Sequence, residues 1–345
     1  MSQRPPATDG QAVAGGNRPD YRAAAAAGIR VLQEWYSPRA GQWKSTGWWN
    51  AANALTAVIL YTKYTGDQSY LGIIETTYTA AQRKNARFIN KFFDDNGWWA
   101  LAWVAAHDLT GDNRYLAAAQ AIFAHNLGGW DSTCGGGLWW NEDRTYKNAI
   151  TNELFLTLAA LLSQRAPAGQ NYRDWALREW QWLHASRLIG PAGLVNDGLT
   201  TACANNQGTT WTYNQGVILG GLAALHEITG DPGYLGQGEV IADAALSTLT
   251  NPAGILAEPS EPSGCNGDQT QFKGIFVRYL HQFWQHSGRA AYRAFILANA
   301  DSVLNNARNS AGQFGLRWAG PFDKADASRQ TSAVEVLTAA AALTA

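Results

Sequence analysis

Apolar residues recur at helical spacing along almost the whole chain after residue 20, with polar positions between them. This periodicity predicts about twelve helices. We expect them at residues 21–36, 48–64, 69–91, 96–109, 113–127, 148–165, 171–187, 211–228, 233–250, 269–286, 289–307 and 328–344. No window alternates apolar and polar residues with a period of two, so the pattern does not predict a sheet.

A seven-residue pattern, Thr-Gly-Asp-x-x-Tyr-Leu, occurs between predicted helices at residues 65–71, 110–116 and 229–235. Its glycine suits the left-handed C-cap of one helix, and its aspartate suits the N-cap of the next. Looser versions lie at 168–172 and 287–292. The tyrosines of these segments are roughly 45 to 62 residues apart, a spacing typical of stacked helical hairpins.

Helices paired in this way predict an all-α fold, an (α/α)6 barrel with six inner and six outer helices. The even-numbered helices are apolar or aromatic nearly all round, as buried inner helices should be. This pattern favours a closed ring, and an open solenoid is the alternative. We expect residues 21–345 to form one domain.

The links after the odd-numbered helices are mostly long, at residues 37–47, 128–147, 188–210, 251–268 and 308–327, with a short one at 92–95. In an antiparallel ring these links share one face, and function concentrates in loops placed by a rigid scaffold. Ten of the sixteen tryptophans lie on or beside that face: Trp43, Trp48, Trp49, Trp98, Trp99, Trp130, Trp139, Trp140, Trp211 and Trp318.

Composition excludes several classes of partner. With 46% hydrophobic and 15% charged residues the chain can bury a large core, and its net charge of -1 gives no electrostatic case for nucleic acid or a membrane surface. No apolar run reaches membrane-spanning length.

Residues 1–20 are polar and rich in Pro and Gly, and we expect a disordered lead-in. Localisation stays open: cytoplasmic if Met1 is the native start, secreted if an export signal was removed.

Two adjacent carboxylates, Asp94 and Asp95, begin a predicted helix that carries Trp98, Trp99 and Trp103 in its next turns. Paired carboxylates can break a glycosidic bond, and sugar rings stack on tryptophan. Neighbouring residues can approach the roughly 5–5.5 Å carboxyl separation of retaining glycosidases. The alternative is a simple N-cap with a favourable first-turn acid.

A general acid in this pair must remain protonated near neutral pH. The helix N-terminus lowers carboxyl pKa values, whereas a neighbouring carboxylate and desolvation by the tryptophans raise them. The raising effects must dominate if the pair is catalytic.

Other kinds of catalytic centre have little support. The six histidines are scattered, the three cysteines match no metal spacing, and we find no phosphate-binding glycine loop and no Gly-x-Ser-x-Gly motif. We therefore expect no metal and no cofactor. The cysteines lie in three successive long links, so either one disulfide with one free thiol or three reduced cysteines is compatible with the sequence.

Six segments together resemble glycoside hydrolase family 76, the α-1,6-mannanases. They are residues 93–103, 135–140, 147–153, 195–199, 211–216 and 271–275, and they span nearly the whole chain after residue 20. The resemblance implies an (α/α)6 barrel, a retaining mechanism without metal, and cleavage inside α-1,6-linked mannan backbones. We accordingly expect an endo-acting hydrolase, monomeric, with mannan or a mannose-containing polysaccharide as its partner.

The resemblance also implies roles for individual residues. It aligns Asp94 with the nucleophile, Asp95 with the general acid/base, and Asp197 with a mannose-binding carboxylate; Asp197 could instead be a turn residue in Asn-Asp-Gly. Further candidates for substrate binding are Trp98, Trp99, Tyr213, Asn214, Gln215, Asn50, Asn53, Trp139 and Trp140. Asn214, Asn50 and Asn53 could equally brace their helices.

One disulfide pairing is favoured within this resemblance. Cys203 and Cys265 each lie shortly before an inner helix, and family members commonly carry cysteines in both places. We therefore expect Cys203–Cys265, with Cys134 as the free thiol.

Three other functions remain possible on the sequence. A transglycosidase would use the same aspartates but transfer the mannosyl unit to a sugar. An epimerase on the same barrel would need histidine pairs over the cavity, whereas the histidines here fall mostly at the far ends of helices. A non-catalytic mannan-binding protein would keep the tryptophans without needing both aspartates.

Overall fold

A computed structural model describes residues 19–166 and 170–345. These residues form twelve α-helices, three short 3-10 helices and one two-stranded sheet. Of the expected disordered lead-in, residues 1–18 lie outside the described residues. Asp20 does not belong to a lead-in, because its carboxylate accepts a hydrogen bond from the Ala23 backbone N–H (2.9 Å) and caps the first helix.

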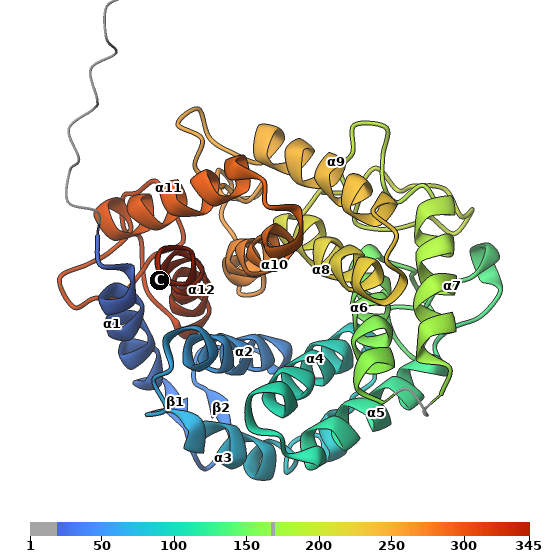
Figure 1. The fold of residues 1–345 in the computed structure, drawn as a ribbon, viewed down its shortest axis with the longest axis horizontal. Coiled ribbons are helices and arrows are strands. Elements are labelled where there is room, and N and C mark those ends of the chain that lie inside the picture. Colours follow the sequence, from blue (N-terminus) through green and yellow to red (C-terminus); the bar gives the residue numbers. More distant parts are fainter. Residues whose placement is uncertain (1–18, 167–169) are drawn as a thin grey trace, which may run out of the picture.

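The helices form two concentric layers (Figure 1). The inner layer consists of α2 (Trp48–Thr65), α4 (Phe93–Thr110), α6 (Ala149–Arg165), α8 (Thr212–Thr229), α10 (Phe272–Ser287) and α12 (Ala327–Thr344). The outer layer consists of α1 (Tyr21–Gln33), α3 (Leu71–Ala81), α5 (Asn113–Leu127), α7 (Tyr172–Ala185), α9 (Gly233–Thr248) and α11 (Ala290–Asn306). Each inner helix contacts the next, and α12 contacts α2, so the ring is closed. The predicted (α/α)6 barrel is confirmed.

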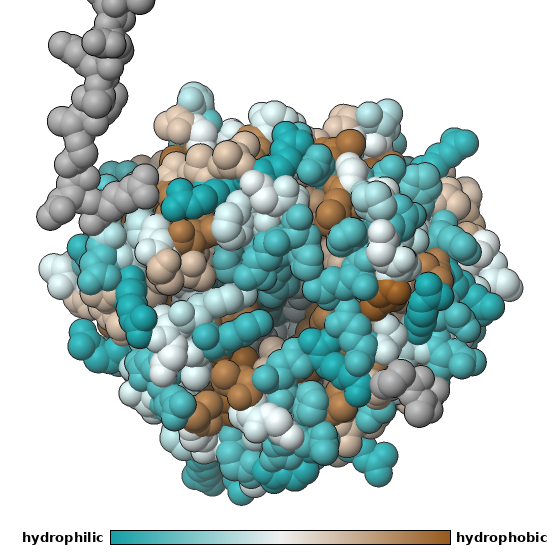
Figure 2. Space-filling view, in the orientation of Figure 1, coloured by the Kyte–Doolittle hydropathy of each residue, from teal (hydrophilic) through white to brown (hydrophobic). Residues whose placement is uncertain are grey.

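Burial separates the two layers as the apolar pattern predicted. The inner helix α12 is buried at nearly every position, whereas the outer helix α9 buries only Gly238, Ile241, Ala242 and Ala245. A helix that is apolar on all sides can only be stable when neighbours surround it. On the face shown in Figure 2, polar residues cover most of the surface and apolar ones lie in small separate patches.

The Thr-Gly-Asp turns connect each inner helix to the following outer helix. Gly66, Gly111 and Gly230 have φ between 73° and 75° and end their helices in the left-handed conformation, as predicted. The aspartate is the N-cap only at α5, where Asp112 accepts a hydrogen bond from the Arg114 backbone N–H. In the other two copies the aspartate also accepts from the backbone N–H two residues later, but it is not the N-cap residue of the following helix.

The prediction of one helix over residues 69–91 is wrong. Helix α3 ends at Ala81, and a 3-10 helix, η1 (Ala86–Phe88), precedes α4. Arg87 and Phe88 have positive φ values of 56° and 63° there, although no Gly or Pro marks the break. Helix α4 therefore begins at Phe93 rather than at residue 96, and both aspartates of the pair lie in its first turn.

The remaining elements lie in the long links. A hairpin of β1 (Tyr36–Ser37) and β2 (Gln42–Trp43) follows α1, η2 (Thr133–Gly135) follows α5, and η3 (Gln269–Gln271) precedes α10. None of the helices in the described residues is both long enough and apolar enough to span a membrane.

Candidate active site

A cleft of about 410 Å³ lies where the N-terminal ends of the inner helices meet the long links. It is lined by Trp49, Phe92, Asp94, Asp95, Trp98, Trp140, Tyr146, Asn148, Asp197, Tyr213, Asp268 and Phe272. The twelve lining residues include four aspartates and no lysine, arginine or histidine. Among the described residues, no group of three His, Cys, Asp or Glu side chains could hold a metal ion.

Asp94 is held by two hydrogen-bond donors. Its Oδ2 accepts from the indole Nε1–H of Trp140 (2.9 Å), and its Oδ1 accepts from the backbone N–H of Asp95 (2.8 Å). Both donors stabilise the charged form of the carboxyl group. The α5–α6 link, through Trp140, therefore fixes the first aspartate of the pair.

Asp95 has a different environment. Its Oδ2 accepts from the side-chain amide Nδ2–H of Asn90 (2.7 Å), and none of the described residues donates to its Oδ1. Asp268 faces it from the link before α10. One carboxylate oxygen of Asp95 is thus free for a ligand.

The electrostatics of the pair favour retention of a proton. Burial raises the pKa of Asp94 well above its usual range, and the neighbouring charge of Asp95 raises it further. Burial also raises the pKa of Asp95 to about 6, while Asn90 lowers it and Asp268 raises it. Desolvation and like charge therefore outweigh the helix N-terminus, as a catalytic pair requires.

Aromatic rings form one wall of the cleft. Trp49 stacks on Trp98 with centroids 5.6 Å apart, and Tyr213 stacks on Phe272 at 3.8 Å. Trp98 and Tyr213 are also nearly parallel, at 6.3 Å, which joins the two pairs. Such a row of rings beside carboxylates suits a chain of sugars, whose apolar faces stack on aromatic side chains.

Asp197 lies in the cleft, as expected from the sequence. Its Oδ2 accepts from the hydroxyl of Tyr146 (2.5 Å), and its Oδ1 accepts from the indole of Trp211 (3.0 Å). Burial raises the pKa of Tyr146, and Asp197 raises it further, so the tyrosine remains the donor. These two hydrogen bonds fix the orientation of the Asp197 carboxylate, which a simple turn residue does not require.

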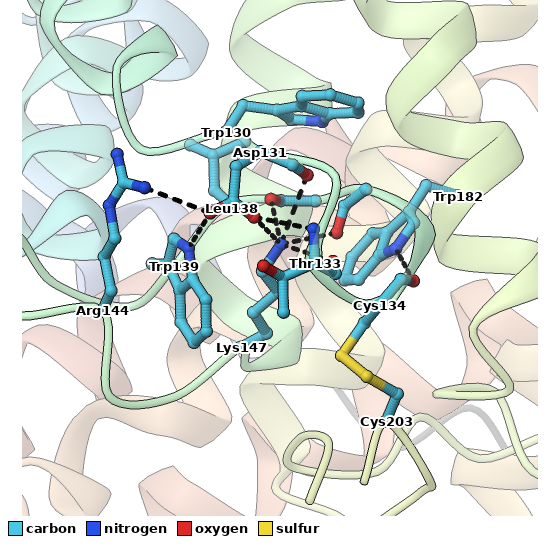
Figure 3. Close-up of polar contacts among 12 residues, drawn as sticks. Trp130, Asp131, Thr133, Cys134, Leu138, Trp139, Arg144, Lys147, Trp182 and Cys203 are labelled. Atoms are coloured by element: carbon cyan, nitrogen blue, oxygen red, sulfur yellow. Dashed lines mark hydrogen bonds and ion pairs between the residues drawn. A yellow bond between two sulfur atoms is a disulfide. The ribbon is translucent and has the colours of Figure 1, made fainter. Parts of the chain in front are cut away.

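A buried lysine organises the α5–α6 link that carries Trp140 (Figure 3). The Nζ of Lys147 donates to Asp131 Oδ1 (2.8 Å) and to the carbonyls of Thr133 (2.8 Å), Gly136 (2.8 Å) and Gly137 (2.9 Å). Its side chain is 1% exposed and lies over the Trp139 ring. Burial raises the pKa of Asp131, but the donors Lys147, Trp139 and the Thr133 backbone N–H together outweigh this and hold that pKa below its usual range.

The predicted disulfide is wrong. Cys134 pairs with Cys203, and Cys265 is the free thiol. The bond joins the α5–α6 link to the α7–α8 link (Figure 3). The α7–α8 link also carries Asp197. Position along the chain suggested Cys265, whereas the folded path of the first link brings Cys134 to Cys203.

Several residues expected to bind substrate lie outside the cleft. Trp99 is fully buried against Trp48, Phe88 and Trp103, so it belongs to the core. Trp139 donates to Asp131 and covers Lys147. Both tryptophans therefore pack the scaffold, as do most of the ten assigned to this face; only Trp49, Trp98 and Trp140 line the cleft.

The amide side chains also proved to be mainly structural. Asn50 donates to Gln271, and Asn53 accepts from Arg278. Gln215 bonds the backbone of Val195 in both directions. Asn214 is fully buried away from the cleft, with no hydrogen-bond partner among the described residues. The alternative that asparagines brace the inner helices is therefore the better one for Asn50 and Asn53.

Sequence reasoning missed six members of the site that the structure brings together: Asn90, Phe92, Tyr146, Asn148, Asp268 and Phe272. Tyr146 and Asp268 end long links, so the rule that these links share a face could have found them. Asn90 fell within a stretch predicted to be helical, where no local signal indicated a site residue.

The sequence profile of glycosyl hydrolase family 76 matches residues 22–345, almost everything that follows residue 20. The chain belongs to glycosyl hydrolase family 76. Mannan endo-1,6-alpha-mannosidase DCW1 of Candida albicans is 31% identical over 259 residues, 68% of this chain and 57% of that protein. Mannan endo-1,6-alpha-mannosidase DFG5 of the same organism is 29% identical over 328 residues, 85% of this chain and 72% of that protein.

Solved structures show the same family 76 fold. The alpha-1,6-mannanase GH76A of Salegentibacter sp., in complex with alpha-1,6-mannotetrose, matches with a TM-score of 0.85 and 26% identity, covering 94% of this chain and 100% of that one. The Lin0763 protein of Listeria innocua matches with a TM-score of 0.84 and 26% identity, covering 93% and 97%. The chain spans 57–58% of the length of the first curated family 76 relatives.

Proposed function

We propose that this family 76 protein is a retaining endo-α-1,6-mannanase in which Asp94 is the nucleophile and Asp95 is the general acid/base. The observation that carries the proposal is the adjacent carboxyl pair in a cleft walled by aromatic rings and free of basic side chains. A neutral polysaccharide is recognised by stacking and hydrogen bonds, which these side chains supply.

The hydrogen bonds support this division of roles. A pair of coupled carboxyl groups titrates as a unit and shares one proton. The two donors to Asp94 stabilise negative charge there, whereas Asp95 has one donor and faces Asp268. We place the shared proton on Asp95 because of these hydrogen bonds, against the effect of burial, which raises the pKa of Asp94 further than that of Asp95.

The reaction then has two steps. A carboxylate oxygen of Asp94 bonds to the anomeric carbon while the glycosidic C–O bond breaks, and Asp95 gives its proton to the departing oxygen. Water next attacks the anomeric carbon, Asp95 takes a proton from that water, and the bond to Asp94 breaks.

The relatives agree with this substrate and with the pair. Family 76 relatives are named mannan endo-1,6-alpha-mannosidases, and the Salegentibacter enzyme was solved with alpha-1,6-mannotetrose. That complex was made with an inactive variant in which two consecutive aspartates are replaced by alanine. Asp94 and Asp95 are the consecutive aspartates in the cleft of this chain.

Linear α-1,6-mannan is the test substrate. We expect early products to be mixed oligosaccharides with little free mannose, released with retained α configuration by NMR. Asp94→Asn and Asp95→Asn should each lower turnover by several orders of magnitude, without additivity. An aryl α-1,6-mannobioside whose leaving group needs no protonation should restore the first step in the Asp95 variant only.

The matched control is Asp143→Asn, because Asp143 is exposed on the α5–α6 link and, within the part of the chain that the structure describes, pairs only with Lys91. Near-normal turnover of mannan by either Asp94→Asn or Asp95→Asn would refute the role assignment. Free mannose as the main early product would show exo action, and products longer than the substrate would show transglycosylation.

A further inference from the structure

Asn90 is the residue outside the carboxyl pair that contacts Asp95 most directly. It lies between η1 and α4, and its Nδ2–H donates to Asp95 Oδ2 (2.7 Å). Its Oδ1 accepts from the backbone N–H of Phe92 (2.8 Å). Since a backbone N–H can only be a donor, the amide oxygen must face Phe92 and the amide N–H must face Asp95. The orientation of the Asn90 amide is therefore fixed.

The backbone of Asn90 is fixed as well. Its N–H donates to Asn96 Oδ1 (2.8 Å), and its carbonyl accepts from Asn96 Nδ2 (3.0 Å). Asn96 is fully buried and also contacts Asn126, which donates to the carbonyl of Phe93 (2.8 Å). This network ties the turn before α4 to the helix that carries the pair.

We propose that Asn90 is a positioning residue that occupies Asp95 Oδ2, so that Asp95 Oδ1 is the oxygen that gives and takes the proton during mannan cleavage. This inference rests on the proposed function. Oδ1 is the candidate because it has no donor among the described residues while Oδ2 already accepts from an N–H. In the first step the Oδ1–H proton passes to the departing glycosidic oxygen, and in the second Oδ1 takes a proton from water.

The hydrogen bond from Asn90 also affects the pH range over which Asp95 stays protonated. The groups that act on Asp95 are Asn90 and Lys84, which lower its pKa, and Asp268, which raises it, with Asp94 adjacent in the pair. Because the amide N–H stabilises the carboxylate, its removal should raise the pKa of Asp95. The acid would then persist to higher pH.

The experiment measures kcat/KM against pH for the wild type, Asn90→Ala and Asn90→Asp. The substrates are linear α-1,6-mannan and the activated aryl α-1,6-mannobioside. Asn90→Asp keeps an oxygen acceptor for the Phe92 N–H, so the turn remains supported even if Asn90→Ala fails to fold. On mannan we expect lower activity and an alkaline limb moved upward by about one pH unit.

On the activated substrate the alkaline limb should not move, because no proton donor is needed in the first step. A loss of activity that is equal at all pH values and on both substrates would overturn the inference and leave Asn90 a structural residue. A wild-type protein inactive on α-1,6-mannan would instead refute the proposed function itself. The two failures are therefore distinguishable.

Discussion

Asp197 shows how much of the site depends on single residues placed by neighbours. Tyr146 and Trp211 hold both of its oxygens, yet each carboxylate oxygen can accept a further hydrogen bond from a sugar hydroxyl. The pair formed by Asp94 and Asp95 could be predicted from the sequence because adjacent residues remain adjacent in any fold. The contact of Asn90 with Asp95 could not, since it depends on a turn at Arg87 and Phe88 that no residue type signalled.

Replacing Asp197 should weaken substrate binding more than it slows chemistry. Asp197→Asn removes the charge but keeps the shape, and a hydrogen bond to a charged group is worth about 1.5–3 kcal/mol. We expect KM for mannan oligosaccharides to rise roughly 10- to 100-fold with little change in kcat. Steady-state kinetics of the Asp197 variant and of the Asp143→Asn control measure both constants. A fall in kcat at unchanged KM would place Asp197 at the transition state instead.

Glu179 should make stability depend on pH. It is fully buried on α7, its Oε2 accepts from Trp130 (3.2 Å), and its Oε1 has no partner among the described residues. Burial raises its pKa to about 8, against the opposing effects of Trp130 and Lys147. Between its ordinary value of 4.5 and about 8 the folded protein binds the extra proton, so stability falls as pH rises through this window.

Glu179→Gln mimics the protonated acid and should remove this pH dependence. The free energy of unfolding of the wild type should fall relative to the variant from pH 5 to pH 8, by at most about 1.4 kcal/mol per pH unit. Urea unfolding at several pH values tests the expectation. Parallel curves for the two proteins would contradict it.

At the scale of elements, the local pattern of apolar residues predicted the helices but not the conformation of the links. Apolar periodicity located the inner helices, but α3 and η1 were merged because apolar residues continue at helical spacing through the break. The α5–α6 link is ordered by Lys147, whose ammonium donates to three backbone carbonyls of the link and to the Asp131 carboxylate. Charge on a buried lysine is stable only with such a shell of acceptors.

Lys147→Met should therefore lower the free energy of unfolding far more than the same substitution at an exposed lysine. Removing one partner of a fully buried ion pair costs about 3–5 kcal/mol; Asp131 is 25% exposed, which lowers its share of this cost, but three carbonyls also lose their donor. The matched control is Lys91→Met, because the Lys91–Asp143 pair is 56% and 61% exposed and should contribute about 0–1 kcal/mol. Urea unfolding gives both values, and similar costs for the two variants would contradict the role of Lys147.

At the scale of the whole molecule, glycines let the inner helices approach closely enough to close the ring. A Cβ on Gly216 of α8 would lie 2.6 Å from the Cα of Phe276 of α10. Backbone atoms cannot move aside as a flexible side chain can. The spacing of the inner ring therefore depends on this absent side chain.

Gly216→Ala should destabilise the barrel by about 1–3 kcal/mol, as overpacking commonly does. Gly236→Ala on the outer helix α9 is the matched control, since nothing lies within 4 Å of its added Cβ. That variant should be neutral or gain up to about 1 kcal/mol from helix propensity. Equal effects of the two substitutions on urea unfolding would show that ring spacing is not limiting.

The sequence by itself determined the number of helices, their alternation between inner and outer layers, the face that carries the long links, and the carboxyl pair. Each of these depends on residues within a few turns of one another or on a repeat. Tertiary structure alone decided that Cys134 rather than Cys265 meets Cys203, that Trp140 donates to Asp94, and that Asn90 holds Asp95. These contacts either join separate links or span a turn that no residue type in the sequence indicates. The path of an irregular link is set by buried groups such as Lys147.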